Sequence, residues 1–386
     1  MTARPLRGGT ALVLVLTGML AACAGFKGQG VPGTDGGSDA GGGSDAGASS
    51  DTGSTADALP GTDSAPTGDA GPIVDSSAPV DTGSPGKDSG PPPCDSSTCG
   101  IETVLTNLDQ AGTLAVDSTN VYVEDQGTTT GDVYQCPKTG CAAPTLLGPG
   151  YATGIASDAQ YVYWNDFSAG EIVRCAIGGC ANAPTVLVPN QPHAEGLSFD
   201  GANLFWAATG NVMACTSPGC TSPTILAGSQ STTIVTTSAE TAVVYWVSSG
   251  AVRACAASGC AQTPTVIATV TAGAAGDDLV VKDGFVYFTS GNSVVSCPTG
   301  SACAFPHTIG SSYSPFGLAT DGSYVYWLDD LIAQVFRCPV TGCVGSAEVF
   351  ADQSSFDPAG EIGTNVALDG EYVYWADPES VYRKHQ

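Results

Sequence analysis

Charged side chains are scarce in this chain of 386 residues, and positively charged ones are the scarcest. Only 12% of the residues are charged, and 11 Lys and Arg stand against 37 Asp and Glu, which gives a formal net charge of −26. So acidic a chain repels phosphate backbones and anionic headgroups, which excludes nucleic acid as a partner and excludes membrane docking through a basic surface. Few charges, with 51 Gly and 25 Pro, indicate strands, turns and a biased linker rather than helices.

Histidine and the familiar catalytic motifs are also nearly absent. The chain has three histidines, His193, His307 and His385. After residue 93 it contains no G-x-S-x-G elbow, no H-E-x-x-H motif and no Walker loop. The sequence therefore favours a binding protein over an enzyme.

No apolar run is long enough to span a bilayer. Arg4 and Arg7 precede the apolar residues 11–20, which are too few for a permanent membrane helix and are typical of a signal peptide. The segment Leu20-Ala21-Ala22-Cys23 follows. Its small residues before a cysteine resemble a bacterial lipobox.

This resemblance implies that residues 1–22 are a lipoprotein signal peptide and that Cys23 is acylated as the new N-terminus. Three acyl chains would hold the protein stably on a membrane. Because Ala24 rather than Asp follows the cysteine, the enterobacterial sorting rule implies delivery to the outer membrane, facing either the periplasm or the exterior. The alternative is an ordinary secretory signal with a chance cysteine.

Residues 24–93 consist almost entirely of Gly, Ser, Thr, Ala, Pro and Asp. They cannot bury enough apolar surface to offset chain entropy, so we expect a disordered tether from the lipidated Cys23 to residue 93. Asp recurs every six residues from Asp39 to Asp81. A self-repelling spacer explains this better than weak Ca²⁺ binding, because single carboxylates on a flexible chain do not converge.

Residues 94–386 repeat one unit seven times. Each unit contains an aromatic strand, whose central residues are Tyr122, Tyr163, Phe205, Tyr245, Tyr287, Tyr326 and Tyr374. Three further short strands surround each aromatic strand, and four strands per unit of about 40 residues are typical of a β-propeller blade. The sequence predicts an all-β, seven-bladed propeller.

The last unit ends before its fourth strand. Residues 365–383 supply three strands of the seventh blade, and the chain stops at Gln386. We expect residues 101–105 to supply the missing outer strand, so that both ends of the domain build one blade.

Fourteen of the 15 cysteines form pairs five or six residues apart, one pair per unit. An oxidised, exported domain with a disulfide in each hairpin explains this spacing better than zinc, because four ligands do not converge and no His follows at ligand spacing. The expected pairs are Cys94–Cys99, Cys136–Cys141, Cys175–Cys180, Cys215–Cys220, Cys255–Cys260, Cys297–Cys303 and Cys338–Cys343.

Three strands contain Tyr-Trp-x-Asp, beginning at Tyr163, Tyr326 and Tyr374. They resemble the strands of YWTD and NHL-type propellers, although YWTD propellers have six blades and lack a cysteine pair in every blade. The resemblance implies the propeller fold and leaves the ligand open.

One face of the expected propeller carries the connections between blades and the turns after the aromatic strands. His193 is the only histidine expected there, and Glu195 follows it closely. Other acidic and aromatic residues of this face are Asp109, Tyr151, Asp166, Phe167, Asp277, Asp278, Tyr313, Phe316, Asp329, Asp330, Phe356 and Glu361. They are candidates for ligand binding; solvation and turn formation are the alternative for each one.

Two functions remain open on this basis. The first is a lipid-anchored, monomeric binding module that recognises a protein or a cell-envelope glycan through this face, without a cofactor. The second is a propeller lyase or hydrolase that uses His193 and acidic residues with a divalent cation.

Overall fold

The computed structural model describes residues 100–386, apart from residues 128–129, 221, 233, 239–240, 272–277, 330 and 353–363. The signal peptide, Cys23, the tether and the Cys94–Cys99 pair lie outside the described residues. Those expectations remain predictions. No helix in the described part of the chain is long and apolar enough to cross a membrane.

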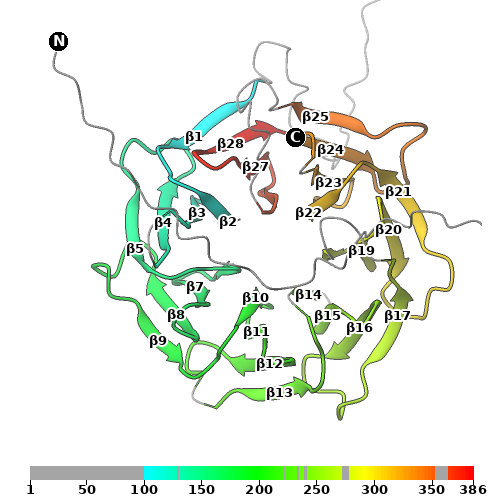
Figure 1. The fold of residues 1–386 in the computed structure, drawn as a ribbon, viewed down its shortest axis with the longest axis horizontal. Coiled ribbons are helices and arrows are strands. Elements are labelled where there is room, and N and C mark those ends of the chain that lie inside the picture. Colours follow the sequence, from blue (N-terminus) through cyan, green and yellow to red (C-terminus); the bar gives the residue numbers. More distant parts are fainter. Residues whose placement is uncertain are drawn as a thin grey trace, which may run out of the picture. The chain divides into compact units, whose positions relative to one another are not determined.

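The described residues form a seven-bladed β-propeller with four antiparallel strands in each blade, as predicted. The strands of a blade are called A to D from the centre outward, and Figure 1 shows them arranged around the ring. Blade 1 comprises β2 (Ala111–Val116), β3 (Asn120–Asp125), β4 (Asp132–Pro137) and β5 (Thr145–Pro149). Blade 2 comprises β6 (Ile155–Ser157), β7 (Tyr161–Asp166), β8 (Glu171–Ala176) and β9 (Thr185–Val188). Blade 3 comprises β10 (Glu195–Phe199), β11 (Asn203–Ala208), β12 (Asn211–Thr216) and β13 (Thr224–Ala227).

Blades 4 to 6 follow the same order. Blade 4 comprises β14 (Val235–Ser238), β15 (Val243–Ser248), β16 (Ala251–Ala256) and β17 (Thr265–Thr269). Blade 5 comprises β18 (Leu279–Lys282), β19 (Phe285–Ser290), β20 (Ser293–Pro298) and β21 (His307–Ser311). Blade 6 comprises β22 (Pro315–Thr320), β23 (Tyr324–Asp329), β24 (Gln334–Pro339) and β25 (Glu348–Asp352).

Blade 7 is built from both ends of the domain, as predicted. Its strands are β26 (Ala367–Leu368), β27 (Tyr372–Ala376), β28 (Ser380–His385) and β1 (Glu102–Thr106). β1 lies beside β28 at the outer edge of the blade (Figure 1), and the pairing is antiparallel. The ion pair Arg383–Glu102, at 2.6 Å, also joins the two strands.

The aromatic strand fills both interfaces of its blade. Because side chains alternate across a strand, the central Tyr faces the following blade and the adjacent Trp faces the preceding one. Tyr163 therefore shares a core with Trp206 of blade 3, and Tyr326 shares one with Trp375 of blade 7. All five Trp are fully buried, as packing between blades requires.

An Asp in the A–B turn holds the hydroxyl of this central Tyr. In blade 2, Asp158 Oδ1 accepts from the backbone N–H groups of Gln160 and Tyr161, while Oδ2 accepts from the Tyr163 hydroxyl at 2.6 Å. Burial and this carboxylate raise the pKa of Tyr163 to about 12. Asp117, Asp321 and Asp369 bond the equivalent Tyr in blades 1, 6 and 7. These carboxylates therefore stabilise turns.

Six of the predicted hairpin disulfides are present among the described residues. In five of the six, the second cysteine contacts the outer strand of the preceding blade. Cys303 N–H donates to Ile267 O of β17 at 2.7 Å, and Cys343 N–H donates to Ile309 O of β21 at 2.8 Å. A disulfide within one blade therefore also orients a contact to its neighbour.

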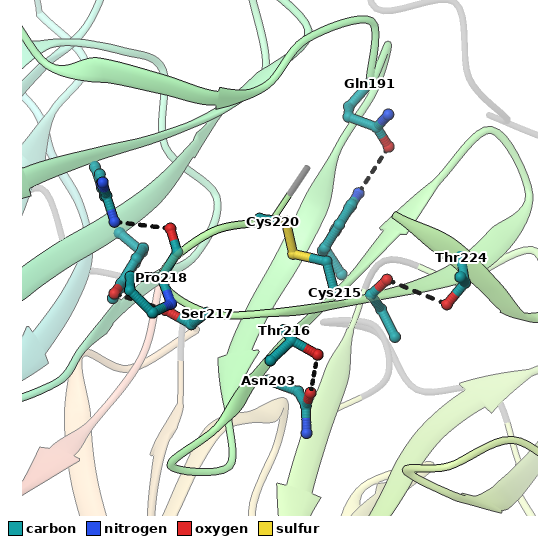
Figure 2. Close-up of a disulfide and its surroundings, with 12 residues drawn as sticks. Gln191, Asn203, Cys215, Thr216, Ser217, Pro218, Cys220 and Thr224 are labelled. Carbon is teal, nitrogen blue, oxygen red and sulfur yellow. Dashed lines mark hydrogen bonds between the residues drawn. A yellow bond between two sulfur atoms is a disulfide. The ribbon is translucent and has the colours of Figure 1, made fainter. Parts of the chain in front are cut away.

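Figure 2 shows the sixth disulfide, Cys215–Cys220, whose loop contacts the two middle strands of blade 2, β7 and β8. Between the two cysteines, Ser217 Oγ lies 2.8 Å from the Tyr163 hydroxyl of blade 2. Pro218 O accepts from Arg174 of the same preceding blade at 2.8 Å. The sequence predicted the covalent pairs but not these contacts between blades.

Closure by β1 predicts unequal effects of two deletions. Removing residues 24–93 should leave the melting temperature unchanged, because those residues offer almost nothing to a core. Removing residues 24–106 should lower it strongly. This deletion exposes the edge of β28 and takes away Val104 and Leu105, which are 4% and 3% exposed and are each worth about 1.5–3 kcal/mol when buried. Thermal unfolding of both purified variants checks this, and equal melting temperatures would contradict closure by β1.

Candidate functional site

The D–A connections and the B–C turns lie together on one face of the propeller, which is called the loop face below. Around blade 2 this face brings three rings together. The Tyr151 and Phe167 rings lie 6.2 Å apart, and the Phe167 and His193 rings meet edge to face at 5.2 Å. Four predicted residues, Tyr151, Phe167, His193 and Glu195, thus gather at one place.

Backbone contacts hold these rings in place. Phe167 N–H donates to Tyr151 O at 3.0 Å, which joins the B–C turn of blade 2 to the connection before it. Asn165, fully buried at the end of β7, donates to Ala194 O next to His193. The hydrogen bond fixes the backbone that presents the exposed His193 ring.

Carboxylates surround the rings. Asp166 accepts from Ala169 N–H at 2.9 Å and caps the turn that carries Phe167. Glu195 is half-buried at the start of β10, and burial raises the pKa of its carboxyl, an effect that nearby His193 partly offsets. We call Tyr151, Asp166, Phe167, Glu171, His193 and Glu195 the acidic–aromatic patch.

A buried carboxyl lies under the edge of this patch. Glu124, near the end of β3, is fully buried, and neither of its oxygens has a hydrogen-bond partner of good geometry. Gly112 leaves room for it, since a Cβ there would lie 1.9 Å from Glu124 Oε2. Neighbouring Gln126 accepts from the Tyr151 hydroxyl at 3.0 Å. Burial raises the pKa of Glu124 to about 8.

The remaining predicted residues lie elsewhere on the face. Tyr313 is 65% exposed in the connection between blades 5 and 6, and Phe316 follows it in β22. Asp329 is fully buried and accepts from the N–H groups of Ser314 and Leu331, so it stabilises the local backbone. Its predicted role in ligand binding is untested. Asp277, Asp330, Phe356 and Glu361 lie outside the described residues.

Asp278 has a role that the sequence did not reveal. Its carboxylate accepts from Leu279 N–H at 2.7 Å and from Leu318 N–H of blade 6 at 2.6 Å, and so joins two inner strands. Asn365 joins blade 7 to Leu114 of blade 1 in the same way. Gly154 occupies the equivalent position, before the inner strand of blade 2. There the backbones of blades 2 and 3 approach each other directly, since a Cβ on Gly154 would lie 2.3 Å from Leu197 N.

The sequence also gave no reason to single out Glu124. The only available signal was its place in the repeat, one residue before the Asp that ends the aromatic strand. Other blades carry Asn165, Ala207 or Leu328 there. An alignment of the seven repeats would have revealed Glu124, because the other blades have a neutral residue at the same position.

The two other histidines lie away from the patch. His307 begins the outer strand β21 and contacts Thr341 O at 3.0 Å, and His385 ends β28 near Glu371. Both strand ends are on the face opposite the loop face. Within the described ranges, no three His, Cys, Asp or Glu side chains are grouped as metal ligands would be.

The raised pKa of Glu124 predicts a pH-dependent stability. Between pH 4.5 and about 8 the unfolded chain loses this proton while the folded chain keeps it, so the free energy of unfolding falls as pH rises. Glu124→Gln removes this penalty. The variant should gain roughly 2–4 kcal/mol at pH 7.5 and little at pH 4. Denaturant unfolding at both pH values measures this, with the exposed Glu379→Gln as control. The same change at both values would show that Glu124 titrates normally.

Comparison with known proteins identifies the fold. No protein-family model and no curated protein matches the chain. Among solved structures, a virginiamycin B lyase from Staphylococcus aureus superimposes with a TM-score of 0.59 at 13% identity, covering 74% of this chain and 99% of that one. A streptogramin B lyase gives 0.58 at 11% identity, covering 74% and 96%. A third structure, with a TM-score of 0.57 at 13% identity over 74% and 99%, is a catalytically inactive His-to-Ala variant of the Staphylococcus aureus lyase with quinupristin. At these identities the likeness shows a shared propeller fold.

Proposed function

We propose that this protein is a binding module that recognises a protein or a cell-envelope glycan through its loop face. The acidic–aromatic patch is the observation that supports this most. It gathers Tyr151, Phe167 and His193 with acidic side chains on loops of two adjacent blades. A rigid ring that presents such groups on loops is a common way to build a recognition surface.

The disulfides place the propeller outside the reducing cytoplasm. We propose further that Cys23 anchors it to the outer membrane through its acyl chains. β1 starts on the face of the A–B and C–D loops, because Glu102 pairs with Arg383 near the end of β28. The chain before β1 therefore joins the ring on the face opposite the patch.

Two exposed aromatic residues on opposite faces test this proposal. Tyr313 lies in a D–A connection of the loop face and is 65% exposed, whereas Phe305 lies in a C–D loop of the other face and is 93% exposed. We expect Tyr313→Ala to weaken co-sedimentation with purified envelope fragments at least threefold and Phe305→Ala to leave it unchanged. Because both side chains are exposed, neither change should alter folding. Equal effects, or a loss with Phe305→Ala alone, would contradict recognition by the loop face.

A lyase is the second candidate, and the fold shared with streptogramin B and virginiamycin B lyases is the observation that favours it. One of those structures is described as inactive after a His-to-Ala change. His193 is the only one of the three histidines in this chain on the loop face, so it would have to act as the acid or base.

This candidate predicts that the protein cleaves quinupristin and that His193→Ala abolishes the reaction while His307→Ala does not. Mass spectrometry of the product checks it. No turnover by the intact protein, or full activity in His193→Ala, would exclude this mechanism.

A further inference from the structure

One position near the end of the aromatic strand links blades 1 and 2 to the D–A connection that follows each of them. In blade 2 this position holds the neutral Asn165, which donates to Ala194 O of the next connection. In blade 1 it holds Glu124, and the backbone N–H of Ala152, the residue after Tyr151, lies at its carboxyl. Of these two links to the acidic–aromatic patch, only the one in blade 1 can change its charge.

A chain of side chains joins Glu124 to Tyr151 a second time. The Tyr151 hydroxyl donates to Gln126 Oε1 at 3.0 Å. The other end of the Gln126 amide meets the carboxyl next to Gly112, where a Cβ would lie 1.9 Å from Glu124 Oε2 and 2.6 Å from Gln126 Nε2. Gln126 therefore contacts the carboxyl with one atom of its amide and the phenol with the other. We call Glu124, Gln126 and Tyr151 the relay.

Burial sets the charge of the relay's carboxyl. It raises the pKa of Glu124 to about 8, and hydrogen bonding by the Gln126 side chain and by the backbone of Thr113 and Ala152 offsets part of the rise. These donors lie close to the carboxyl, although none has good hydrogen-bond geometry to either oxygen. The carboxyl therefore keeps its proton at neutral pH and releases it near pH 8.

Few other ionisable groups adjoin Glu124 in the described part of the chain. The charge of Asp125, the next residue of β3, adds to its raised pKa. Asp166 faces blade 1 from the end of β7, on the same side of that strand as Trp164. The β4 residue opposite Glu124 is a valine, and β2 and β6 contain no ionisable residue. In the connection, burial and the charge of Glu124 raise the pKa of Tyr151, so its hydroxyl stays protonated while Glu124 titrates.

The relay has a complementary arrangement for each charge state. With the carboxyl charged, Gln126 Nε2 donates to it and Gln126 Oε1 accepts the Tyr151 proton, which is the direction of the Tyr151 hydrogen bond in the structure. With the carboxyl protonated, its O–H needs an acceptor, and Gln126 Oε1 serves once the amide has turned by a half rotation. Gln126 Nε2 then donates to the Tyr151 oxygen, and the hydroxyl proton of Tyr151 points away from Gln126.

We propose that Glu124 is a proton-controlled positioning residue of the loop face, which decides through Gln126 whether the Tyr151 hydroxyl donates inward or to a ligand. This inference rests on the proposed function and names the regulation of its site. While Glu124 is neutral, the hydroxyl is available to an oxygen acceptor on the ligand. Once Glu124 is charged, the hydroxyl is held by Gln126. Recognition by the patch therefore weakens as the pH rises through about 8.

The position of the Tyr151 proton can be followed without a ligand. In the full chain labelled with carbon-13 at tyrosine Cζ, the Cζ resonance responds to hydrogen bonding of the hydroxyl, and loss of one signal in Tyr151→Phe assigns it. We expect the Tyr151 signal to shift with a midpoint near pH 8. The shift should disappear in Glu124→Gln, fall at least by half in Gln126→Leu and persist in the exposed control Glu379→Gln.

Three results of this titration would overturn the proposal. The first is a Tyr151 signal that stays in place between pH 6 and pH 9.5. The second is an equal shift in the wild type and in Glu124→Gln, because another group would then be titrating. The third is a full shift in Gln126→Leu, because the carboxyl would then act on Tyr151 through space and not through the amide.

Co-sedimentation with purified envelope fragments tests the consequence for recognition. At pH 9 we expect Glu124→Gln to bind at least threefold more tightly than the wild type, whereas at pH 6.5 the two should bind equally. Comparing two proteins at one pH cancels any titration of the fragments themselves. Equal binding at both pH values would overturn regulation by Glu124. Absence of binding by either protein would instead count against the proposed function, and the Tyr151 titration would still decide whether Glu124 controls the hydroxyl.

Discussion

Closure of the ring by β1 is the constraint on which the other contacts depend. Each blade packs its central Tyr or Phe against the next blade, and in five blades the preceding blade covers a Trp, so an open ring leaves two sheet faces exposed. Pairing of β1 with β28 completes blade 7, and Cys141 N–H of blade 1 then donates to Val104 O of β1 at 3.1 Å. The last interface is therefore made by the first strand of the domain.

The two faces of the closed ring have different roles. On the A–B and C–D face, acids such as Asp158 and Asp369 bond turns and Tyr hydroxyls, and the cations stack on Tyr rings. The disulfide loops on the same face contact the preceding blade. Charge is thus used there to hold the structure together. On the loop face, the D–A connections and B–C turns contain no Lys or Arg, and the rings of Tyr151, Phe167 and His193 gather there.

Much of the fold could be predicted because the repeat is visible in the sequence. The aromatic strands and the cysteine pairs fixed the number of blades, and the incomplete last unit indicated that residues near 101–105 would pair with it. The predicted outer strand differs by one residue from β1, Glu102–Thr106, because the turn residues that end a strand are not set by its apolar pattern.

The site was less predictable because it depends on which loops meet. The sequence placed Tyr151, Phe167 and His193 on one face, but only the structure shows that their rings touch while Tyr313 lies in a separate blade. It also could not distinguish acids that support the fold, such as Asp278 and Asp329, from acids that face solvent. That difference is decided by backbone N–H groups from neighbouring strands, which no local pattern reveals.

Hydrogen exchange measured along the whole chain tests the division between the two faces most directly. With purified envelope fragments in excess, amide exchange should slow in residues 150–154, 166–170 and 189–195, which form the connections and the turn around the acidic–aromatic patch. Exchange in the A–B turns at residues 158–160, 200–202 and 369–371 should stay unchanged. Protection of the A–B turns, with none around the patch, would contradict the assignment of recognition to the loop face.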